Sequence, residues 1–118
     1  MKEQLEALKT ADIYIENIKL EIGNLVQQIN SGEQNNGIKL VYLLADGIEQ
    51  LVDLINLTKG LHKDGISIRN TNDILEEMIE ALENEDYVLI SDLSQYEFLP
   101  IFEGIQNDIR HIIANYGE

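Results

Sequence analysis

Three carboxylates stand among apolar residues in the segment DYVLISDLSQYEFLP, which spans residues 86–100. Asp86 suits a helix start, but a helical wheel of about 100° per residue places Asp92 inside an apolar arc and Glu97 beside one. A buried carboxylate needs a hydrogen-bond donor or a cation, or else it takes up a proton. Asp92 and Glu97, with the neighbouring Tyr96 hydroxyl, are therefore candidate ligand-binding residues. The other interpretation is a buried polar network that only stabilises the fold.

The residue types that catalytic and metal sites need are scarce in this chain. There is no cysteine, which excludes thiolate catalysis and thiolate metal ligation. Di-metal carboxylate bundles need Glu-x-x-His pairs, whereas His111 has Asp108 and His62 has Lys59 at that spacing. Neither histidine has a recognisable serine partner for hydrolysis. We therefore expect no catalytic residue, no metal site and no cofactor, and a protein that is not an enzyme.

The charge balance is strongly acidic. The 118 residues include 22 acidic and 8 basic side chains, for a formal net charge of -14. This field repels phosphate backbones and anionic lipid head groups, so we expect no nucleic acid and no membrane among the partners. The sequence contains no apolar run long enough for a membrane span, and its first ten residues do not resemble a signal peptide. A short cysteine-free domain fits a cytoplasmic location.

Helical periodicity of apolar residues runs through nearly the whole chain, and no strand-like alternation persists. Breaker-rich segments at 30–37 and 58–72 interrupt it, and a weaker break falls at 83–86. The pattern predicts helices over about 2–29, 33–59 (beginning at Glu33 or Ile38), 72–84 and 86–116. Thr71 or Asn72 is the expected cap of the third helix. A hydrophobic content of 44% suits one globular domain over residues 1–118.

The single proline, Pro100, must disturb the last helix, because proline removes one backbone hydrogen bond and its ring pushes the preceding turn away. Before it, Leu89 and Leu93 define one apolar face. After it, Ile105 and Ile109 define a face almost opposite. We therefore predict an all-α, up-down antiparallel helical bundle of three long helices and one short one, with the last helix kinked or broken at Pro100.

The same C-terminal segment resembles a motif in small uncharacterised helical proteins of Gram-positive, spore-forming bacteria. That motif reads approximately DYVLLADLLEYEL, followed after one position by PLL. The residues of this chain that match are Asp86, Tyr87, Asp92, Tyr96, Glu97 and Pro100. Those that depart are Ser91, Ser94 and Gln95, which the helical wheel places on the outward side. The resemblance covers this segment alone. It implies a helical fold and carries no known activity.

Two classes of function fit these observations. The wide apolar arcs, the acidic charge and the missing catalytic constellations favour a non-enzymatic protein-interaction bundle, acting as an adaptor or as a chaperone of helical segments. The alternative is a bundle that binds a small ligand or cation through buried carboxylates and tyrosines. We also expect self-association, most simply as a twofold homodimer. The candidate contact residues are Ile13 and Leu20 on the outer side of the first helix, and Phe98 and Phe102 around the kink.

Overall fold

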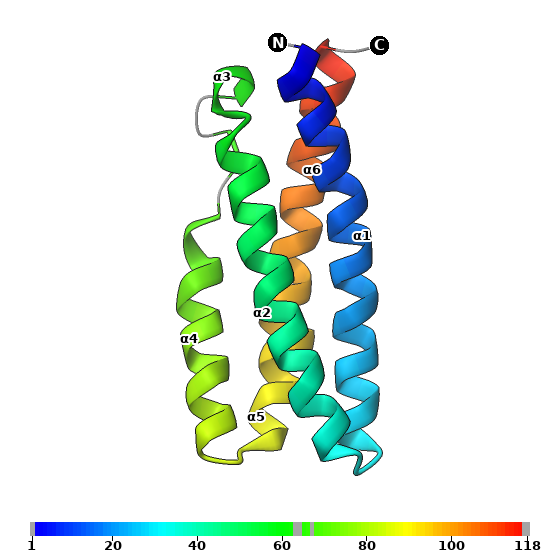
Figure 1. The fold of residues 1–118 in the computed structure, drawn as a ribbon, viewed down its shortest axis with the longest axis vertical. Coiled ribbons are helices and arrows are strands. Elements are labelled where there is room, and N and C mark those ends of the chain that lie inside the picture. The colour runs from blue at the N-terminus through cyan, green and yellow to red at the C-terminus, as the bar shows by residue number, and fades with distance from the viewer. Residues whose placement is uncertain (1, 63–64, 67, 117–118) are drawn as a thin grey trace.

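The computed structural model describes residues 2–62, 65–66 and 68–116 as an elongated helical bundle of 45 × 21 × 19 Å. The elements are α1 (Lys2–Asn30), α2 (Gln34–Asn56), α3 (Lys59–His62), α4 (Arg69–Glu83), α5 (Tyr87–Asp92), η1 (Leu93–Phe98) and α6 (Leu99–Tyr116). The long helix α1 runs antiparallel to α2 and to the long rod α5–η1–α6, and α2 and this rod run in the same direction (Figure 1). The shorter α4 covers one half of the bundle. This confirms the predicted all-α bundle of three long helices and one short one.

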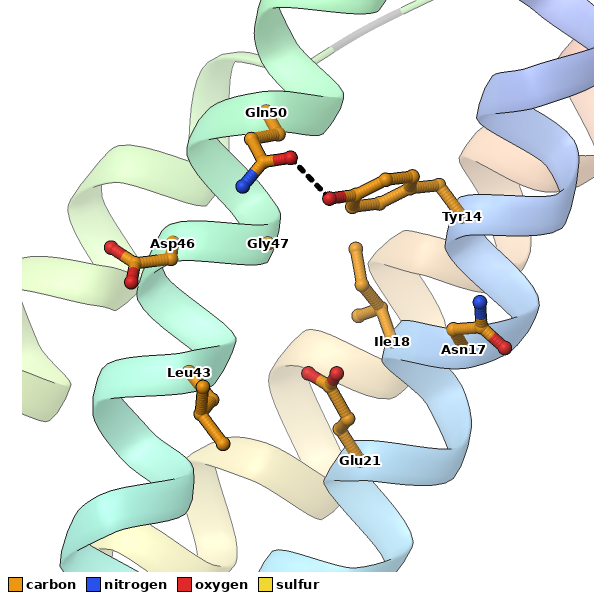
Figure 2. A pocket seen from close by; sticks show the side chains of 8 residues that line it. All are labelled: Tyr14, Asn17, Ile18, Glu21, Leu43, Asp46, Gly47 and Gln50. Carbon is orange, nitrogen blue, oxygen red and sulfur yellow. Dashed lines mark hydrogen bonds between the residues drawn. The ribbon is translucent and has the colours of Figure 1, made fainter.

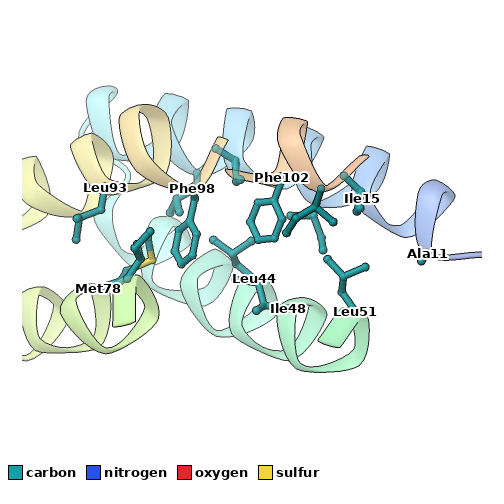
Figure 3. Close-up of a cluster of buried hydrophobic side chains, with 14 of the residues drawn as sticks. Ala11, Ile15, Leu44, Ile48, Leu51, Met78, Leu93, Phe98 and Phe102 are labelled. Carbon is teal, nitrogen blue, oxygen red and sulfur yellow. The ribbon is translucent and has the colours of Figure 1, made fainter. Parts of the chain in front are cut away.

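Each long helix turns an apolar stripe toward the centre of the bundle. The stripe on α1 follows three- and four-residue steps, as one helical face requires, and consists of Leu8, Ala11, Ile15, Ile18, Ile22, Leu25 and Ile29. The corresponding stripe on α2 begins at Val41 and ends at Ile55. Phe98 and Phe102 stack with ring centroids 5.6 Å apart and lie beside Leu44 in the core (Figure 3).

The turns after α1 and α4 have the same hydrogen-bond pattern. Gly32 has a left-handed φ of 83°, and the N–H groups of Gly32 and Glu33 donate to the carbonyls of Ile29 and Gln28 at 3.1 and 2.9 Å. This is a Schellman motif, which satisfies helix-end carbonyls by placing one residue in the left-handed region. After α4 the left-handed position is held by Glu85, with φ 55° and corresponding bonds of 3.1 and 2.8 Å. Glycine usually occupies such positions because a Cβ is strained there.

The helix starts are capped differently from each other. The Asp86 carboxylate accepts a hydrogen bond from the Leu89 N–H at 3.2 Å, so the predicted cap of the last helix is confirmed. The predicted cap of α4 at Thr71 or Asn72 is wrong, because α4 begins at Arg69 and Ile68 precedes it. Thr71 lies in the first turn, where its hydroxyl donates to the Ile68 carbonyl at 2.7 Å. This bond satisfies the hydroxyl within the helix.

The last helix is continuous from Tyr87 to Tyr116, but a π-helical turn interrupts its α-helical geometry at Leu93–Phe98. Leu99 separates this turn from Pro100, which is the second residue of α6. Its ring crowds the carbonyl four residues earlier and it has no N–H to donate, and a wider π turn accommodates both effects. The predicted break is thus confirmed as a π turn that ends just before Pro100.

The π turn changes which residues face the core. It holds about one more residue than an α turn, which corresponds to a rotation of about 100° relative to an uninterrupted α-helix. This rotation lets α5 and α6 present apolar residues to one core, although their stripes diverge on a continuous wheel. Ile90 and Leu93 are buried before and within the turn, and Ile105 and Ile109 are buried after it.

None of the helices in the described part of the chain is both long and apolar enough to cross a membrane.

Candidate functional site

Asp92, Tyr96 and Glu97 all lie on the outside of the bundle, and the Tyr96 side chain is 67% exposed. The prediction that Asp92 and Glu97 are buried carboxylates is therefore wrong. Asp92 does lie among apolar residues, but that arc, which includes Val88 and Leu89, faces solvent. Glu97 lies within η1, where the extra residue of the π turn rotates it away from the core.

Two serines of this segment face the core, where the predicted apolar arc would have placed larger side chains. Ser91 and Ser94, expected to face outward, are buried. The Ser94 hydroxyl donates to the Ile90 carbonyl at 2.8 Å, and the Ser91 hydroxyl donates to the Asn30 side-chain oxygen at 3.4 Å. Because serine can satisfy its hydroxyl within the helix, it can be buried where neighbouring helices approach closely. A helical wheel that considers only apolar residues does not detect a buried face that contains serines.

The predicted contact residues divide into two groups. Ile13 and Leu20 project into solvent from α1, with 65% and 66% of each residue exposed. Phe98 and Phe102 are fully buried, so the prediction that they form a contact surface is wrong. The rotation at η1 turns both rings into the core, where they fill the space between the long helices.

The most distinctive polar group lies in a half-open cleft of about 330 Å³ between α1 and α2. The cleft is lined by Tyr14, Asn17, Ile18, Glu21, Leu43, Asp46, Gly47 and Gln50. The Tyr14 hydroxyl donates to the Gln50 side-chain oxygen and so bridges the two helices at one end (Figure 2). The Glu21 carboxylate extends into the space between the helices, whereas the Asp46 carboxylate points away from it (Figure 2).

Glu21 carries an acceptor that the rest of the described chain does not satisfy. Its Oε2 atom is shielded from solvent, and no donor among the described residues reaches it. Burial raises the pKa of the Glu21 carboxyl above its ordinary value of 4.5. Shielded polar atoms without a partner are rare in folded proteins, and they concentrate at functional positions. Sequence reasoning missed Glu21. The signal that could have found it is Gly47, since a glycine inside a helix often marks a close approach.

A second polar cluster joins α1 to α6 and is internally compensated. Gln106 is 2% exposed, and its amide nitrogen donates to Asp12 Oδ1 and Glu16 Oε1, both at 2.9 Å. Lys19 donates to the Gln106 oxygen at 3.2 Å, and Arg110 pairs with Asp12 at 3.0 Å. The hydrogen bond from Gln106, with the charges of Lys19 and Arg110, lowers the pKa of Glu16. We assign this cluster the role of fixing α6 along α1.

A third feature is an apolar groove of about 490 Å³ between α2 and α4. Its lining consists of Ala45, Ile48, Glu49, Val52, Asp53, Asn72, Leu75 and Ile79. Ile79 is 41% exposed although it faces this apolar surface. The exposed carboxylates of Glu49 and Asp53 form one edge, and helical spacing places the exposed Glu76 beside the other. The groove exists because α4 packs mainly on α5 and η1 and leaves part of α2 uncovered.

Neither the α1–α2 cleft nor the α2–α4 groove has the ligands of a metal centre. Within the residues that the structure describes, no three His, Asp or Glu side chains converge closely enough to hold a metal ion. His62 lies in α3, where its Nε2 atom is 2.9 Å from the Thr58 hydroxyl. The groups available for recognition are therefore carboxylates, amides, a tyrosine hydroxyl and apolar side chains.

The fold and these surfaces define an acidic all-α bundle with a polar cleft between α1 and α2 and an apolar groove between α2 and α4. The model of the family described as a domain of unknown function (DUF8042) matches residues 6–108, so the chain belongs to this family. No match was found among curated proteins, and none among solved structures. The matched residues run from α1 into α6 and include every residue of the cleft and the groove.

Proposed function

We propose that this protein is a non-enzymatic interaction module that binds a basic amphipathic helix of another protein in the α2–α4 groove. The observation that supports the proposal is the combination of an apolar floor with a carboxylate edge. Ile48, Leu75 and Ile79 would receive the apolar face of the incoming helix. Glu49 and Asp53 would face its lysine and arginine side chains, whose approach the net charge of -14 would favour.

An adaptor or chaperone-like role follows from this proposal, because the protein would hold a helical segment without transforming it. The role requires no cofactor and no catalytic group. Nucleic acid and anionic membranes are poor partners, since the negative field repels their phosphates. A cytoplasmic location belongs to the proposal and is consistent with the absence of cysteine.

The alternative function, binding of a small ligand or cation, has support at a different position from the one expected. Asp92, Tyr96 and Glu97 are exposed on the outside of the bundle. Glu21 instead provides a shielded carboxylate oxygen inside a cleft. The α1–α2 cleft therefore replaces the α5–η1 surface as the candidate position for this function.

The interaction proposal is tested with two fluorescent peptides that share one helical leucine pattern. One peptide carries lysine at its polar positions and the other carries glutamate. We expect saturable binding of the lysine peptide alone, measured by fluorescence anisotropy at about 150 mM salt, where the Debye length is about 8 Å. The Ile79→Glu variant should weaken this binding about tenfold, which corresponds to about 1.4 kcal/mol.

A matched variant separates groove binding from general charge attraction. Ile13→Glu adds the same negative charge on an exposed face of α1. Nonspecific attraction would make both variants bind the basic peptide slightly more tightly, whereas groove binding makes only Ile79→Glu weaker. Equal affinity of the two variants for the lysine peptide, or absence of saturable binding to the wild-type protein, would overturn the proposal.

A further inference from the structure

The α1–α2 cleft contains an acceptor for which the described protein supplies no donor. Glu21 Oε2 is shielded by the surrounding side chains, and among the described residues no N–H or O–H group reaches it. The Tyr14 hydroxyl, one of the donors in the cleft, is already directed to Gln50 on α2. A carboxylate in such a place is stabilised by a group that brings both a positive charge and hydrogen-bond donors.

The remaining walls of the cleft restrict what such a group can be attached to. Ile18 and Leu43 form apolar walls, and Gly47 contributes no side chain on the α2 side. A Cβ atom at Gly47 would lie 3.6 Å from Ile18 Cγ1 and 3.9 Å from Glu21 Oε2. A side chain at residue 47 would therefore occupy part of the space beside the carboxylate. Its volume of about 330 Å³ is near the small end of ligand pockets.

We propose that the α1–α2 cleft binds a small organic monocation, an ammonium or guanidinium group on a short alkyl chain, with Glu21 as its counter-ion. The head group pairs with the Glu21 carboxylate, and the alkyl chain lies between Ile18 and Leu43. An organic cation suits the cleft better than a metal ion because, within the described residues, no three acidic or histidine side chains converge there. The acidic field of the whole chain raises the local concentration of cations.

The test uses n-butylammonium as the probe and 1-butanol as its neutral counterpart. Both are titrated into isotopically labelled protein at neutral pH, and amide and methyl NMR shifts are followed. We expect saturable shifts with n-butylammonium that centre on residues 14–21 and 43–50. The alcohol should bind at least about tenfold more weakly, because it brings no charge to the carboxylate. Equal affinity for the two probes would overturn the proposal.

Two variants remove the cleft's charge and its space separately. Glu21→Gln removes the counter-ion and should weaken n-butylammonium binding about tenfold or more, whereas Glu97→Gln, at an exposed carboxylate, should leave it unchanged. Gly47→Leu fills the cleft without changing the charge and should also abolish binding. Gly104→Leu is its matched control, because no atom lies within 4 Å of a Cβ at Gly104. Unchanged affinity in either Glu21→Gln or Gly47→Leu would refute the site.

The same head group can come from a free amine or from a lysine side chain, which is itself an n-butylammonium group. Lysine blocked at both backbone ends separates these sources. Binding as tight as that of n-butylammonium assigns the cleft to a protein's lysine, and binding much weaker assigns it to a free amine. This site does not depend on the α2–α4 groove, so Ile79→Glu should leave n-butylammonium binding unchanged.

Discussion

Burial beside Ile18 and Gly47 makes the Glu21 position unfavourable for a negative charge. Because its pKa is raised in the folded state, the favourable contribution of Glu21 is complete below pH 4.5 and is lost as pH rises through the folded pKa. The other titratable groups in the cleft, Tyr14 and Asp46, provide no positive charge at neutral pH. Glu21 therefore lowers the free energy of unfolding at pH 7.

We predict that Glu21→Gln stabilises the protein at pH 7, by no more than about 1 kcal/mol since the site is half-open to solvent. The gain should shrink toward zero as pH falls below 4.5, where the wild-type carboxyl is protonated. Urea unfolding at pH 7 and pH 4 measures both values. Glu97→Gln controls for the general relief of acidic charge. A wild-type protein more stable than the Gln variant at pH 7 would contradict the prediction.

Asp92 illustrates how exposure changes the expected cost of a substitution. Because its side chain is exposed and no partner atom is left stranded, Asp92→Ala should change the free energy of unfolding by at most about 0.5 kcal/mol. Ile90→Ala, two residues earlier but fully buried, should cost about 2–5 kcal/mol. Thermal melts of the two variants measure the contrast. A loss above about 1 kcal/mol for Asp92→Ala would indicate a buried network that the structure does not contain.

At the scale of elements, the turn between α4 and α5 contains a strained backbone position that a single substitution can relieve. Glu85 holds the left-handed position of a Schellman motif, which costs a residue with a Cβ about 1 kcal/mol. We predict that Glu85→Gly stabilises the protein by about 0.5–1 kcal/mol, since glycine adopts this φ without strain. Differential scanning calorimetry measures the change in Tm.

Two further substitutions, one that removes a glycine and one that introduces a glycine, serve as controls for this prediction. Gly32→Ala, at the equivalent position after α1, should destabilise by about 1 kcal/mol, because φ there is 83°. Glu83→Gly, inside the last turn of α4, should also destabilise, by about 0.5–1 kcal/mol. If Glu85→Gly lowered Tm as Glu83→Gly does, the left-handed turn would not be the determining feature.

The helices and their order were predictable because isoleucine and leucine recur at three- and four-residue steps over long stretches. The boundaries of α1 follow the same pattern, from Lys2 to Asn30 against a predicted end at Ile29. The π turn was not predictable in detail. Pro100 indicates that the helix is disturbed near residue 100. The form of the disturbance depends on how α5 and α6 pack on α1, and a local sequence pattern contains no information on this packing.

The candidate site was less predictable than the fold, for two physical reasons. A wheel with a constant angle misplaces every residue beyond a π turn, so Glu97 and Phe98 exchanged their expected environments. Glu21 lies on a flank of α1 rather than in its apolar stripe, and only its packing against α2 shields the carboxylate. Contacts between helices decide such burial, and these contacts are absent from any single helix's pattern.

At the scale of the whole molecule, the uncompensated acidic charge limits stability. The net charge is -14, whereas ion pairs among the described residues use Lys9, Lys19 and Arg110 as their basic partners. Self-repulsion among the remaining carboxylates favours the unfolded chain. We predict that raising NaCl from about 10 to 200 mM raises Tm by several degrees, because screening shortens the Debye length from about 30 Å to below 8 Å. A Tm that is constant or falls would show that local pairs dominate.

Self-association remains a prediction at this same scale. Ile13 and Leu20 are the exposed apolar residues of α1 available for a twofold contact, and the acidic field opposes it. We therefore expect a dimer by multi-angle light scattering at high protein concentration and moderate salt. Leu20→Glu should return the protein to a monomer. A wild-type monomer under those conditions would remove the prediction.

We expect the π turn to divide the bundle into two units that differ in local stability. α6 packs along α1, whereas α5 packs on both α4 and α1, and η1 connects α5 to α6. Backbone hydrogen bonds are weakest where helical geometry changes and where Pro100 donates none. The α4–α5 pair can therefore detach at η1 while α1, α2 and α6 stay folded, as a cooperative unit of lower stability. Amide protons of α4 and α5 would then exchange together and earlier than those of the three-helix remainder, and each opening would uncover the Met78 and Phe98 end of the core.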